Sequence, residues 1–464
     1  MTPVLAAADA HVPHVAWIWP FVALLLAIAV FPLVPALAHW WEHNRNKLFV
    51  AVLLGAITLA YYGLRGAGLH TQGGRMSTPG GATVRAVLAH AVVAEYVPFM
   101  VLLFSLYVIA GGIVVRGDVR ATPAVNTGIL AVGGLLASLI GTTGAAMVLI
   151  RFLLKTNSER KHVAHTVVFF IFIVANIGGS LLPIGDPPLF LGYLKGIDFF
   201  WTLGMWREWA FLLVILLAVY YVWDTRAYRH EPPERLRQDA ALRTPLHVAG
   251  LVNVLWLLGV VGAVATLDPS KAFPGTAWHA PEHLREGVQL AMAGLSLLTT
   301  AGWMRRENRF NYVAIGEVAC LFIGIFVTMQ VPIEILQIRG PTLGLAHAYQ
   351  FFWATGLLSS FLDNAPTYVV YFQTAGTLAP AGMTLMQGVD TATGAIPIPL
   401  LQAVSCGAVF MGANTYIGNG PNFMVKAIAE QAGVKMPSFL GYMAYSCGIL
   451  VPLFVLVTLV FFRA

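Results

Sequence analysis

The amino-acid sequence predicts an all-α membrane protein that crosses the bilayer many times. Of its 464 residues, 58% are hydrophobic and only 10% are charged, and the mean hydropathy is +0.75. A soluble globular chain carries roughly 25% charged residues. Apolar runs long enough to span a bilayer recur along the chain between short polar loops. Together these observations exclude a soluble protein.

Ten of the apolar runs are expected to be single transmembrane segments. The first run follows no basic region and precedes no small-residue cleavage site, so we expect a transmembrane helix there rather than a signal peptide. In chain order, the predicted spans are 17–38, 47–64, 86–115, 163–194, 206–224, 245–266, 285–303, 311–333, 399–425 and 438–462.

Two further apolar stretches, 121–154 and 343–376, are interrupted midway by small and polar residues. The interruptions read SLIGTTGAA and SSFLDNAPT. Each stretch is long enough for two short helices but too short for two full spans. We therefore predict two re-entrant helical hairpins, which are tolerated only where protein or a water-filled cavity surrounds the tip. At the second tip, Pro366 is expected to end the first short helix.

The distribution of basic residues predicts the orientation. With the N-terminus outside, the inward loops carry 17 Lys or Arg and the outward segments carry 9. Cytoplasmic loops are enriched in Lys and Arg, so this bias assigns the inward loops to the cytoplasm. Because topology also explains the net charge of +6, no nucleic-acid partner is expected. The inward loops are 39–47, 116–120, 155–161, 225–243, 304–310 and 426–435.

The two halves of the chain resemble each other. Glu95 precedes Thr142 by 47 residues, and Glu317 precedes Asn364 by the same number. In this register LASLIGTTGAAMVL aligns with LSSFLDNAPTYVVY, and VANIGGSLLPIGDPPLF matches GANTYIGNGPNFM. With the orientation above, the two hairpins open from opposite sides. We therefore predict inverted structural repeats with two discontinuous transmembrane helices, an architecture of secondary transporters.

The repeats divide the chain into five regions. A polar, proline-containing connector separates the two halves, and the remaining helices are expected to form a scaffold. The regions are N-terminal scaffold helices (1–84), the first repeat (85–224), a cytoplasmic connector (225–244), linking helices of the scaffold (245–303) and the second repeat (304–464).

The four interrupted segments combine helix-breaking residues with oxygen-bearing side chains. Glycine and proline free main-chain carbonyls, while Asn, Thr and Asp add the oxygens that a hard cation prefers. The C-terminal ends of half-helices add negative dipole ends. We predict that these segments meet and bind the transported ion. The predicted binding residues are Asp363, Asn364, Thr367, Thr142, Thr143, Asn176, Asp186, Asn414, Asn419 and Asn422, with Na⁺ itself at Asp363, Asn364, Thr142, Asn176 and Asn414.

Carboxylates dominate the predicted site. Asp186 and Asp363 lie at the breaks, and Glu95 and Glu317 lie within preceding spans. A charge inside the bilayer costs roughly 2.5–3.5 kcal/mol on insertion scales, so such residues are usually functional. Arg151 is the only basic residue near the breaks, which favours a cation over an organic anion. All four acids are candidate proton carriers. Alternatively, Glu95 pairs with a basic group and Glu317 lies at the membrane interface.

Other function classes lack their signatures. The sequence has no GxxxxGK[ST] P-loop, which argues against an ATP-driven pump. Its cysteines and histidines show no metal-ligand spacing, and the histidines are not placed for enzyme catalysis. We therefore expect neither enzyme activity nor a cofactor.

The segments ANIGGSLLPIGDPPLFLGYLKGIDFFW, LDNAPTYVVYF and GANTYIGNGPNFMVKAIAE resemble the NhaD-type sodium/proton antiporters of the ion transporter superfamily. That superfamily also contains arsenite permeases and divalent-anion/sodium symporters. The resemblance covers most of the chain from about residue 85, and it implies a homodimer with a scaffold and a moving, elevator-type transport domain. The anion symporters carry Ser-Asn-Thr at the tips, whereas this chain has Gly-Thr-Thr (141–143) and Asp-Asn-Ala-Pro-Thr (363–367), which favours the antiporter branch.

These features together predict Na⁺/H⁺ antiport by alternating access. Cation and proton would compete for one carboxylate, so that no separate proton channel is needed. Na⁺ or Li⁺ would leave the cytoplasm as H⁺ enters, across a bacterial cytoplasmic (inner) membrane. The alternatives are a transporter of a di- or tricarboxylate or of arsenite, and an ion channel.

Overall fold

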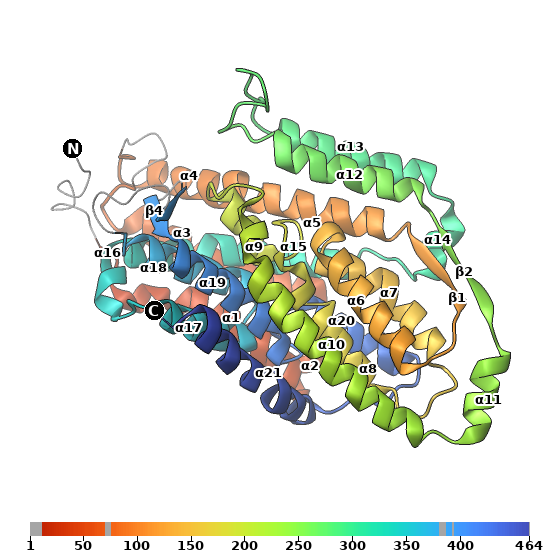
Figure 1. Cartoon of the computed structure of the whole chain (residues 1–464). Coiled ribbons are helices and arrows are strands. Elements are labelled where there is room, and N and C mark those ends of the chain that lie inside the picture. The colour runs from red at the N-terminus through yellow and green to blue at the C-terminus, as the bar shows by residue number, and fades with distance from the viewer. Residues whose placement is uncertain (1–11, 70–75, 380–386, 392–393, 464) are drawn as a thin grey trace.

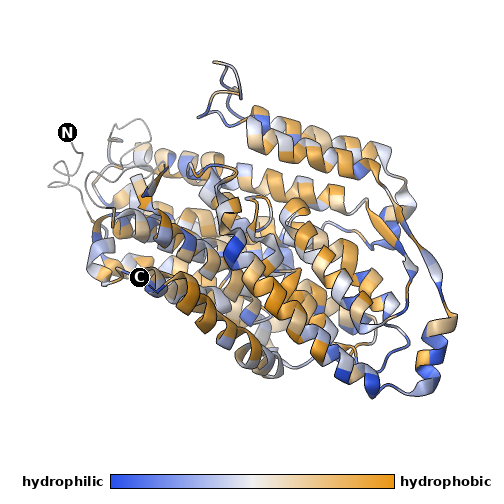
Figure 2. Ribbon diagram, viewed as in Figure 1, coloured by the Kyte–Doolittle hydropathy of each residue, from blue (hydrophilic) through white to orange (hydrophobic). Residues whose placement is uncertain are grey.

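The computed structural model describes residues 12–69, 76–379, 387–391 and 394–463, and within them the fold is helical apart from two small antiparallel strand pairs. Most helices run along the long dimension of the molecule (Figure 1). Their surfaces are largely apolar, and hydrophilic residues concentrate on the connector around α11 and the neighbouring loops (Figure 2).

Six helices in the described part of the chain are long and apolar enough to cross a membrane, or seven if one bent pair is a single span. This confirms the predicted class of an all-α, multi-pass membrane protein. The six are Asn44–Leu64, Gly81–Ala110, Pro123–Ile140, Trp201–Arg229, Val313–Leu343 and Phe439–Phe461.

The N-terminal region corrects the first predicted span. Instead of one helix over 17–38, α1 and α2 meet at a bend of 101°. Pro35 begins α2, because proline lacks the amide that a continuing helix needs but is tolerated in the first turn of a new one. The elements here are α1 (Trp19–Val30), α2 (Pro35–Trp41), α3 (Asn44–Leu64), α4 (Gly81–Leu88), a π-helical segment (Ala89–Tyr96) and α5 (Val97–Ala110).

The first half contains both predicted interruptions. α6 ends at Ile140 and α7 begins at Thr142, and between them Gly141 has φ 78°, a conformation that favours glycine. A second break separates α8 from α9 and holds only a short 3₁₀ turn. The elements are α6 (Pro123–Ile140), α7 (Thr142–Thr156), α8 (Ala164–Ile173), the turn (Ile177–Ser180), α9 (Pro187–Leu194) and α10 (Trp206–Arg229).

The second half repeats this pattern. α17 ends at Phe361 and α18 begins at Asn364, so Pro366 lies in the first turn of α18 and does not end α17 as expected. Another 3₁₀ turn interrupts the chain between α19 and α20. The elements are α15 (Val313–Thr328), α16 (Gln330–Arg339), α17 (Ala348–Phe361), α18 (Asn364–Gly376), α19 (Ile398–Met411), the turn (Gly412–Asn414), α20 (Gly420–Gln431) and α21 (Phe439–Phe461).

A two-stranded sheet joins the halves where continuous helix was expected. Strand β1 (Val114–Asp118) pairs with β2 (Thr244–Ala249), so the predicted span 245–266 becomes helical only at Val252. The alternating TPLHVA sequence suits a strand, and its partner residues include valines. The remaining elements are α11 (Pro233–Ala241), α12 (Val252–Thr266), α13 (Leu284–Thr299), α14 (Gly302–Glu307), β3 (Gly388–Thr391) and β4 (Gly394–Pro397).

Helix α8 lies at the centre of the packed core. Every residue from Val167 to Ala175 has an exposed fraction of zero. A helix that is apolar all round must be enclosed by other helices, and α8 contacts α6, α10 and α20. Its C-terminal end leads directly into the break at Asn176, so this rigid core fixes the position of the interrupted segment.

A buried ion cluster ties α8 and α10 together near the loop 155–161. The carboxylate of Asp224 accepts two hydrogen bonds from the Arg160 guanidinium, at 2.6 and 3.0 Å, and a third contact from His165 Nε2 at 2.9 Å. Asp224 is fully buried. Removing one partner of a buried ion pair leaves the other charge uncompensated, which is strongly destabilising.

We therefore expect Asp224→Asn to destabilise the fold by about 3 kcal/mol. Thermal unfolding of the detergent-purified protein should show a lower apparent melting temperature. The matched control is Asp198→Asn, which removes an exposed carboxylate paired with Lys271 and should leave the melting temperature unchanged. Equal melting temperatures for the wild type and Asp224→Asn would contradict a structural role for the cluster.

Candidate binding site at the helix breaks

Four helices begin at the interrupted segments: α7, α9, α18 and α20. Glycine or proline stands at or near each start. Gly141 precedes α7, while Pro188, Pro366 and Pro421 lie in the first turns of the other three. First-turn amides have no partner within their own helix, so proline loses nothing there. The residues at these four N-termini are the ones that meet.

The buried carboxylate of Asp186 is the point where the four segments join. Asp186 precedes α9 and is 1% exposed. Its Oδ1 accepts hydrogen bonds from Thr142 Oγ1 at 2.9 Å and from Asn419 Nδ2 at 3.1 Å. Its Oδ2 accepts one from Asn364 Nδ2 at 2.6 Å. One carboxylate therefore holds both hairpin tips and the second interrupted helix.

A chain of buried amides extends from this carboxylate. Asn419 Nδ2 also donates to Asn176 Oδ1 at 3.2 Å, and Asn176 Nδ2 donates to Asn422 Oδ1 at 2.7 Å. Asn422 Nδ2 in turn donates to the main-chain carbonyls of Gly412 and Thr415. The amides thus connect the break in the first half to the break in the second.

Asp363 lies at the tip of the second hairpin, where it caps α18. Its Oδ1 accepts a hydrogen bond from the amide of Ala365 at 3.0 Å, which satisfies one of the free donors of the first turn. Thr367 Oγ1 donates back to the Asp363 carbonyl at 3.0 Å and does not contact Asp186. Asp363 directly precedes Asn364, whose amide donates to Asp186. The two acids therefore lie on adjoining segments of one site.

Two amide oxygens at the site have no hydrogen-bond partner among the described residues. They are Oδ1 of Asn364, which is fully buried, and Oδ1 of Asn414. The nitrogen of Asn414 donates to Ser360 Oγ at 2.9 Å. A buried acceptor without a donor is costly, so these oxygens call for a cation or for a hydrogen-bond donor from a ligand.

Glycines let the interrupted main chains approach each other closely. A Cβ at Gly185 would lie 2.2 Å from the carbonyl oxygen of Gly179, and one at Gly418 would lie 2.6 Å from that of Gly412. The two pairs have the same spacing of six residues in the two halves. Any larger residue at these positions would push the two main-chain segments of the break apart and displace the site residues on them.

The two halves contribute related but unequal groups. Thr142 and Asn364 are each the first residue of the second hairpin helix, while Asp186 and Asn419 each precede the helix after the break. Each half therefore supplies one acid, Asp186 at its broken helix and Asp363 at its hairpin tip. The first hairpin tip has no acid, and the acid of the first half is Asp186, at the break before α9.

The two glutamates expected within preceding spans do not contact Asp186. Glu95 lies in the π-helical segment and pairs with Lys195 Nζ at 2.6 Å, with both side chains buried. Glu317 pairs with Lys47 Nζ at 2.6 Å. Each glutamate is thus compensated by its own lysine, which is the alternative the sequence left open for Glu95. The Glu317 side chain is 42% exposed, and its interfacial position stays a prediction.

Two other predicted residues lie apart from the carboxylate. Thr143 follows Thr142 in α7, is half-buried and makes no hydrogen bond to Asp186. Arg151 is further along α7 and faces a different cavity, with its Nη1 buried and unpartnered in the described structure. No group of three or more His, Cys, Asp or Glu residues in the described ranges is arranged to hold a metal ion.

Sequence reasoning missed one residue that shapes the site, Thr415, and gave another too little weight. Thr415 Oγ1 donates to the carbonyl of Ser360 and accepts the amides of Ile417 and Gly418, so it ties the second break to the second hairpin. The sequence analysis also gave Asp363 more weight than Asp186 as the ion-binding carboxylate. The missed signal is the helix-start pattern of an Asp or Asn followed by proline within three residues, which occurs in GDPP, DNAP and NGP.

The site combines positive helix ends with negative side chains. Four helix N-termini converge on it, and each carries a partial positive charge that stabilises an anion. Asp186 and Asp363 already lie at two of these N-termini, and no lysine or arginine in the described part of the chain donates to Asp186. The arrangement can hold a cation between carboxylate and amide oxygens and can receive a carboxylate at a helix N-terminus.

Comparison with known proteins shows which family the chain resembles. Residues 9–462 match the family described as "Putative citrate transport". No curated protein sequence matches the chain. The match covers nearly the whole chain, including all four interrupted segments. The protein therefore belongs to this citrate-transport family of secondary transporters.

Proposed function

We propose that the protein is a secondary transporter that moves a citrate-like polycarboxylate and couples its movement to a cation or proton bound at Asp186. The observation that carries the proposal is the position of the Asp186 carboxylate, which bonds to both hairpin tips and to the second broken helix. A ligand that changes the charge of this group changes the contacts of every interrupted segment at once.

The cation or proton is expected at the acidic centre. Asp186 and Asp363 supply two negative charges, and the unpartnered oxygens of Asn364 and Asn414 supply neutral ligands of the kind that Na⁺ prefers. Protonation of Asp186 would remove the negative charge that strengthens its three hydrogen bonds, so these bonds weaken. Coupling follows, because proton binding loosens a contact that a hairpin tip makes.

The anionic part of the substrate is expected at the helix N-termini. Free main-chain amides in a first turn bind carboxylates, and discontinuous transporter helices present such ends to anionic substrates. A bound cation would also offset the repulsion between the substrate and the two aspartates. Substrate and cation therefore stabilise each other, which is the basis of symport.

Na⁺/H⁺ antiport remains a second candidate because no basic side chain contacts Asp186 in the described structure. In that case cation and proton compete for Asp186 without a carboxylate substrate. The bacterial inner membrane, the homodimer and the elevator-type movement implied by the resemblance belong to the proposal in either form.

We expect Asp186→Asn to reduce citrate uptake by about tenfold or more, because it removes the charge that binds the coupling ion. The measurement is uptake of radiolabelled citrate into proteoliposomes under an imposed Na⁺ or proton gradient. Asp363→Asn should keep measurable uptake with weaker apparent cation affinity, since asparagine can still cap α18. The exposed Asp198→Asn serves as the control without effect.

The same vesicles separate the two candidate functions. With a pH-sensitive dye inside, Na⁺ added without citrate should not collapse a pH gradient if the protein is a carboxylate symporter. A collapse on Na⁺ addition alone, with no citrate uptake, would instead establish antiport. Citrate uptake by Asp186→Asn at the wild-type rate would contradict the symport form, and a wild-type collapse of the pH gradient by Na⁺ in Asp186→Asn would contradict the antiport form.

A separate prediction concerns Glu95 and Lys195. Glu95→Gln leaves a buried ammonium group unpaired and should lower the apparent melting temperature, whereas Glu95→Gln combined with Lys195→Met removes both charges and should restore it. If the pair is structural, this double variant keeps proton-coupled uptake. A double variant with wild-type stability but no proton coupling would identify Glu95 as the proton carrier.

A further inference from the structure

A cavity of about 740 Å³ lies away from the Asp186 site. It is bounded by the C-terminal end of α7, the start of α8, the loop before α15 and the end of α20, and its lining includes Arg235 of α11. Four of the loops predicted to be cytoplasmic meet here, so they share one side of the molecule. None of the residues that hydrogen-bond to Asp186 lines the cavity.

Positive charge in this cavity is not cancelled by its own acid. Among the described lining residues the acid is Glu307, which is engaged outside the cavity lining by Arg116. The Arg116 guanidinium holds the pKa of the Glu307 carboxyl below its usual value, so this acid stays ionised and paired with Arg116. Arg160 is likewise compensated by Asp224. The lining cations without an ion pair to an acid in the described structure are Arg151, Lys155, Lys161, Arg235, Arg309 and Lys435.

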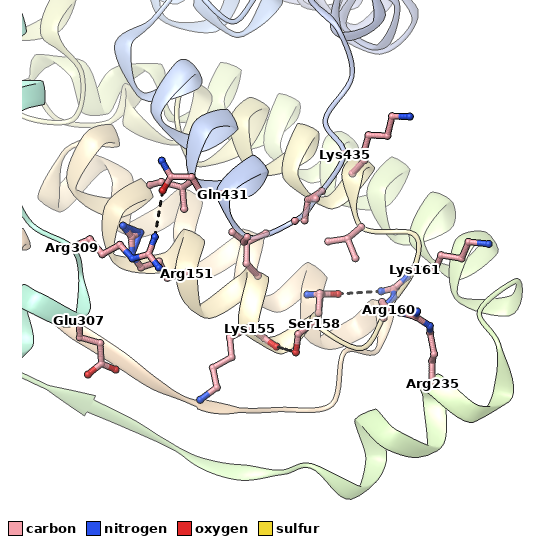
Figure 3. A pocket seen from close by; sticks show the side chains of 18 residues that line it. Arg151, Lys155, Ser158, Arg160, Lys161, Arg235, Glu307, Arg309, Gln431 and Lys435 are labelled. Carbon is pink, nitrogen blue, oxygen red and sulfur yellow. Dashed lines mark hydrogen bonds between the residues drawn. The ribbon is translucent and has the colours of Figure 1, made fainter. Parts of the chain in front are cut away.

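Arg151 and Arg309 are the centre of this cluster. They reach the cavity from α7 and from the loop before α15, and their guanidinium groups are close enough to repel each other (Figure 3). Arg151 Nη1 is buried without a partner, and Arg309 makes only a 3.5 Å hydrogen bond to Gln431. Two adjacent like charges without a counter-charge are unfavourable unless an anion binds between them.

Membrane topology does not account for Arg151. The positive-inside rule explains Lys and Arg in short cytoplasmic loops, including Arg309 in 304–310, but Arg151 lies within a helix of the first hairpin. Arg309 adopts φ 47° because it ends α14: the amide of Phe310 bonds to the carbonyl of Arg305 and that of Arg309 to the carbonyl of Arg306, a common helix terminus. This terminus aims the Arg309 side chain from a fixed main-chain position.

We propose that this cavity is a second binding site, which takes a small polycarboxylate anion between Arg151 and Arg309. A guanidinium group donates two parallel hydrogen bonds to a carboxylate, so two arginines suit an anion with at least two carboxylates. Lys155, Lys161 and Lys435 add attraction at the rim. The choice of a carboxylate rests on the function proposed above, whereas the need for a small multivalent anion rests on the unpaired arginines.

The site joins the two halves of the chain. Arg151 belongs to the first half and Arg309 to the second, so a bound anion would bridge them. Such a ligand favours the conformation in which the two groups are close over any in which they separate. Binding there would thus hold the transporter in one conformation when polycarboxylate is abundant on that side.

The test measures citrate binding to the detergent-purified full chain by calorimetry. The background is Asp186→Asn, in which the first site is impaired. We expect citrate to bind this variant, and adding Arg151→Gln or Arg309→Gly to weaken binding by about tenfold each. Arg309→Gly also relieves the left-handed conformation, so it should fold at least as well as its parent. Arg243→Gln removes an exposed arginine outside the cavity and should not change binding.

Three results would overturn the proposal. Citrate affinity unchanged by both Arg151→Gln and Arg309→Gly would show that the arginines do not bind it. No citrate binding to Asp186→Asn would show that only one site exists. Binding of phosphatidylglycerol that citrate cannot displace would assign the cavity to a lipid headgroup. Failure of citrate uptake by the wild type, with arginine-dependent binding intact, would refute the transport proposal but leave this site standing.

Discussion

The arrangement of the molecule depends on keeping one carboxylate inside an apolar protein. Asp186 is nearly inaccessible to solvent, and an ionised group there must be surrounded by hydrogen-bond donors. Its donors are the side chains of Thr142, Asn364 and Asn419, which stand at the starts of three other helices. Interruption of the helices brings these side chains and the helix N-termini to the same point. The glycines and prolines of the breaks follow from that requirement.

The role of each buried charged group can be inferred from whether it has a partner of opposite charge. Glu95 and Asp224 are each paired with a basic side chain and hold helices together. Among the described residues Asp186 contacts only neutral donors, so its charge is left for a ligand to compensate. Arg151 and Arg309 show the opposite imbalance, with positive charge and no ion pair to an acid in the same ranges. Unpaired charge of opposite sign therefore marks two separate places, one for a cation and one for an anion.

Sequence patterns predicted the helical class and the positions of the breaks, because long apolar runs and clusters of glycine, proline and asparagine are local signals. The inverted orientation of the repeats and the re-entrant form of the hairpins stay predictions. Contacts between distant segments were harder to predict. The pairing of β1 with β2 depends on strands far apart in the chain, and the central position of Asp186 depends on donors from three other segments. The prediction that Pro366 ends α17 was wrong, because proline is common both after the end of a helix and in the first turn of the next one.

The most direct test of the central claim is infrared difference spectroscopy of the purified protein as the coupling cation is added. If Asp186 binds the cation, the wild type should show a change in carboxylate bands that disappears in Asp186→Asn and persists in Glu95→Gln/Lys195→Met. An undiminished carboxylate signal in Asp186→Asn would contradict the account, because the ion would then bind at another acid.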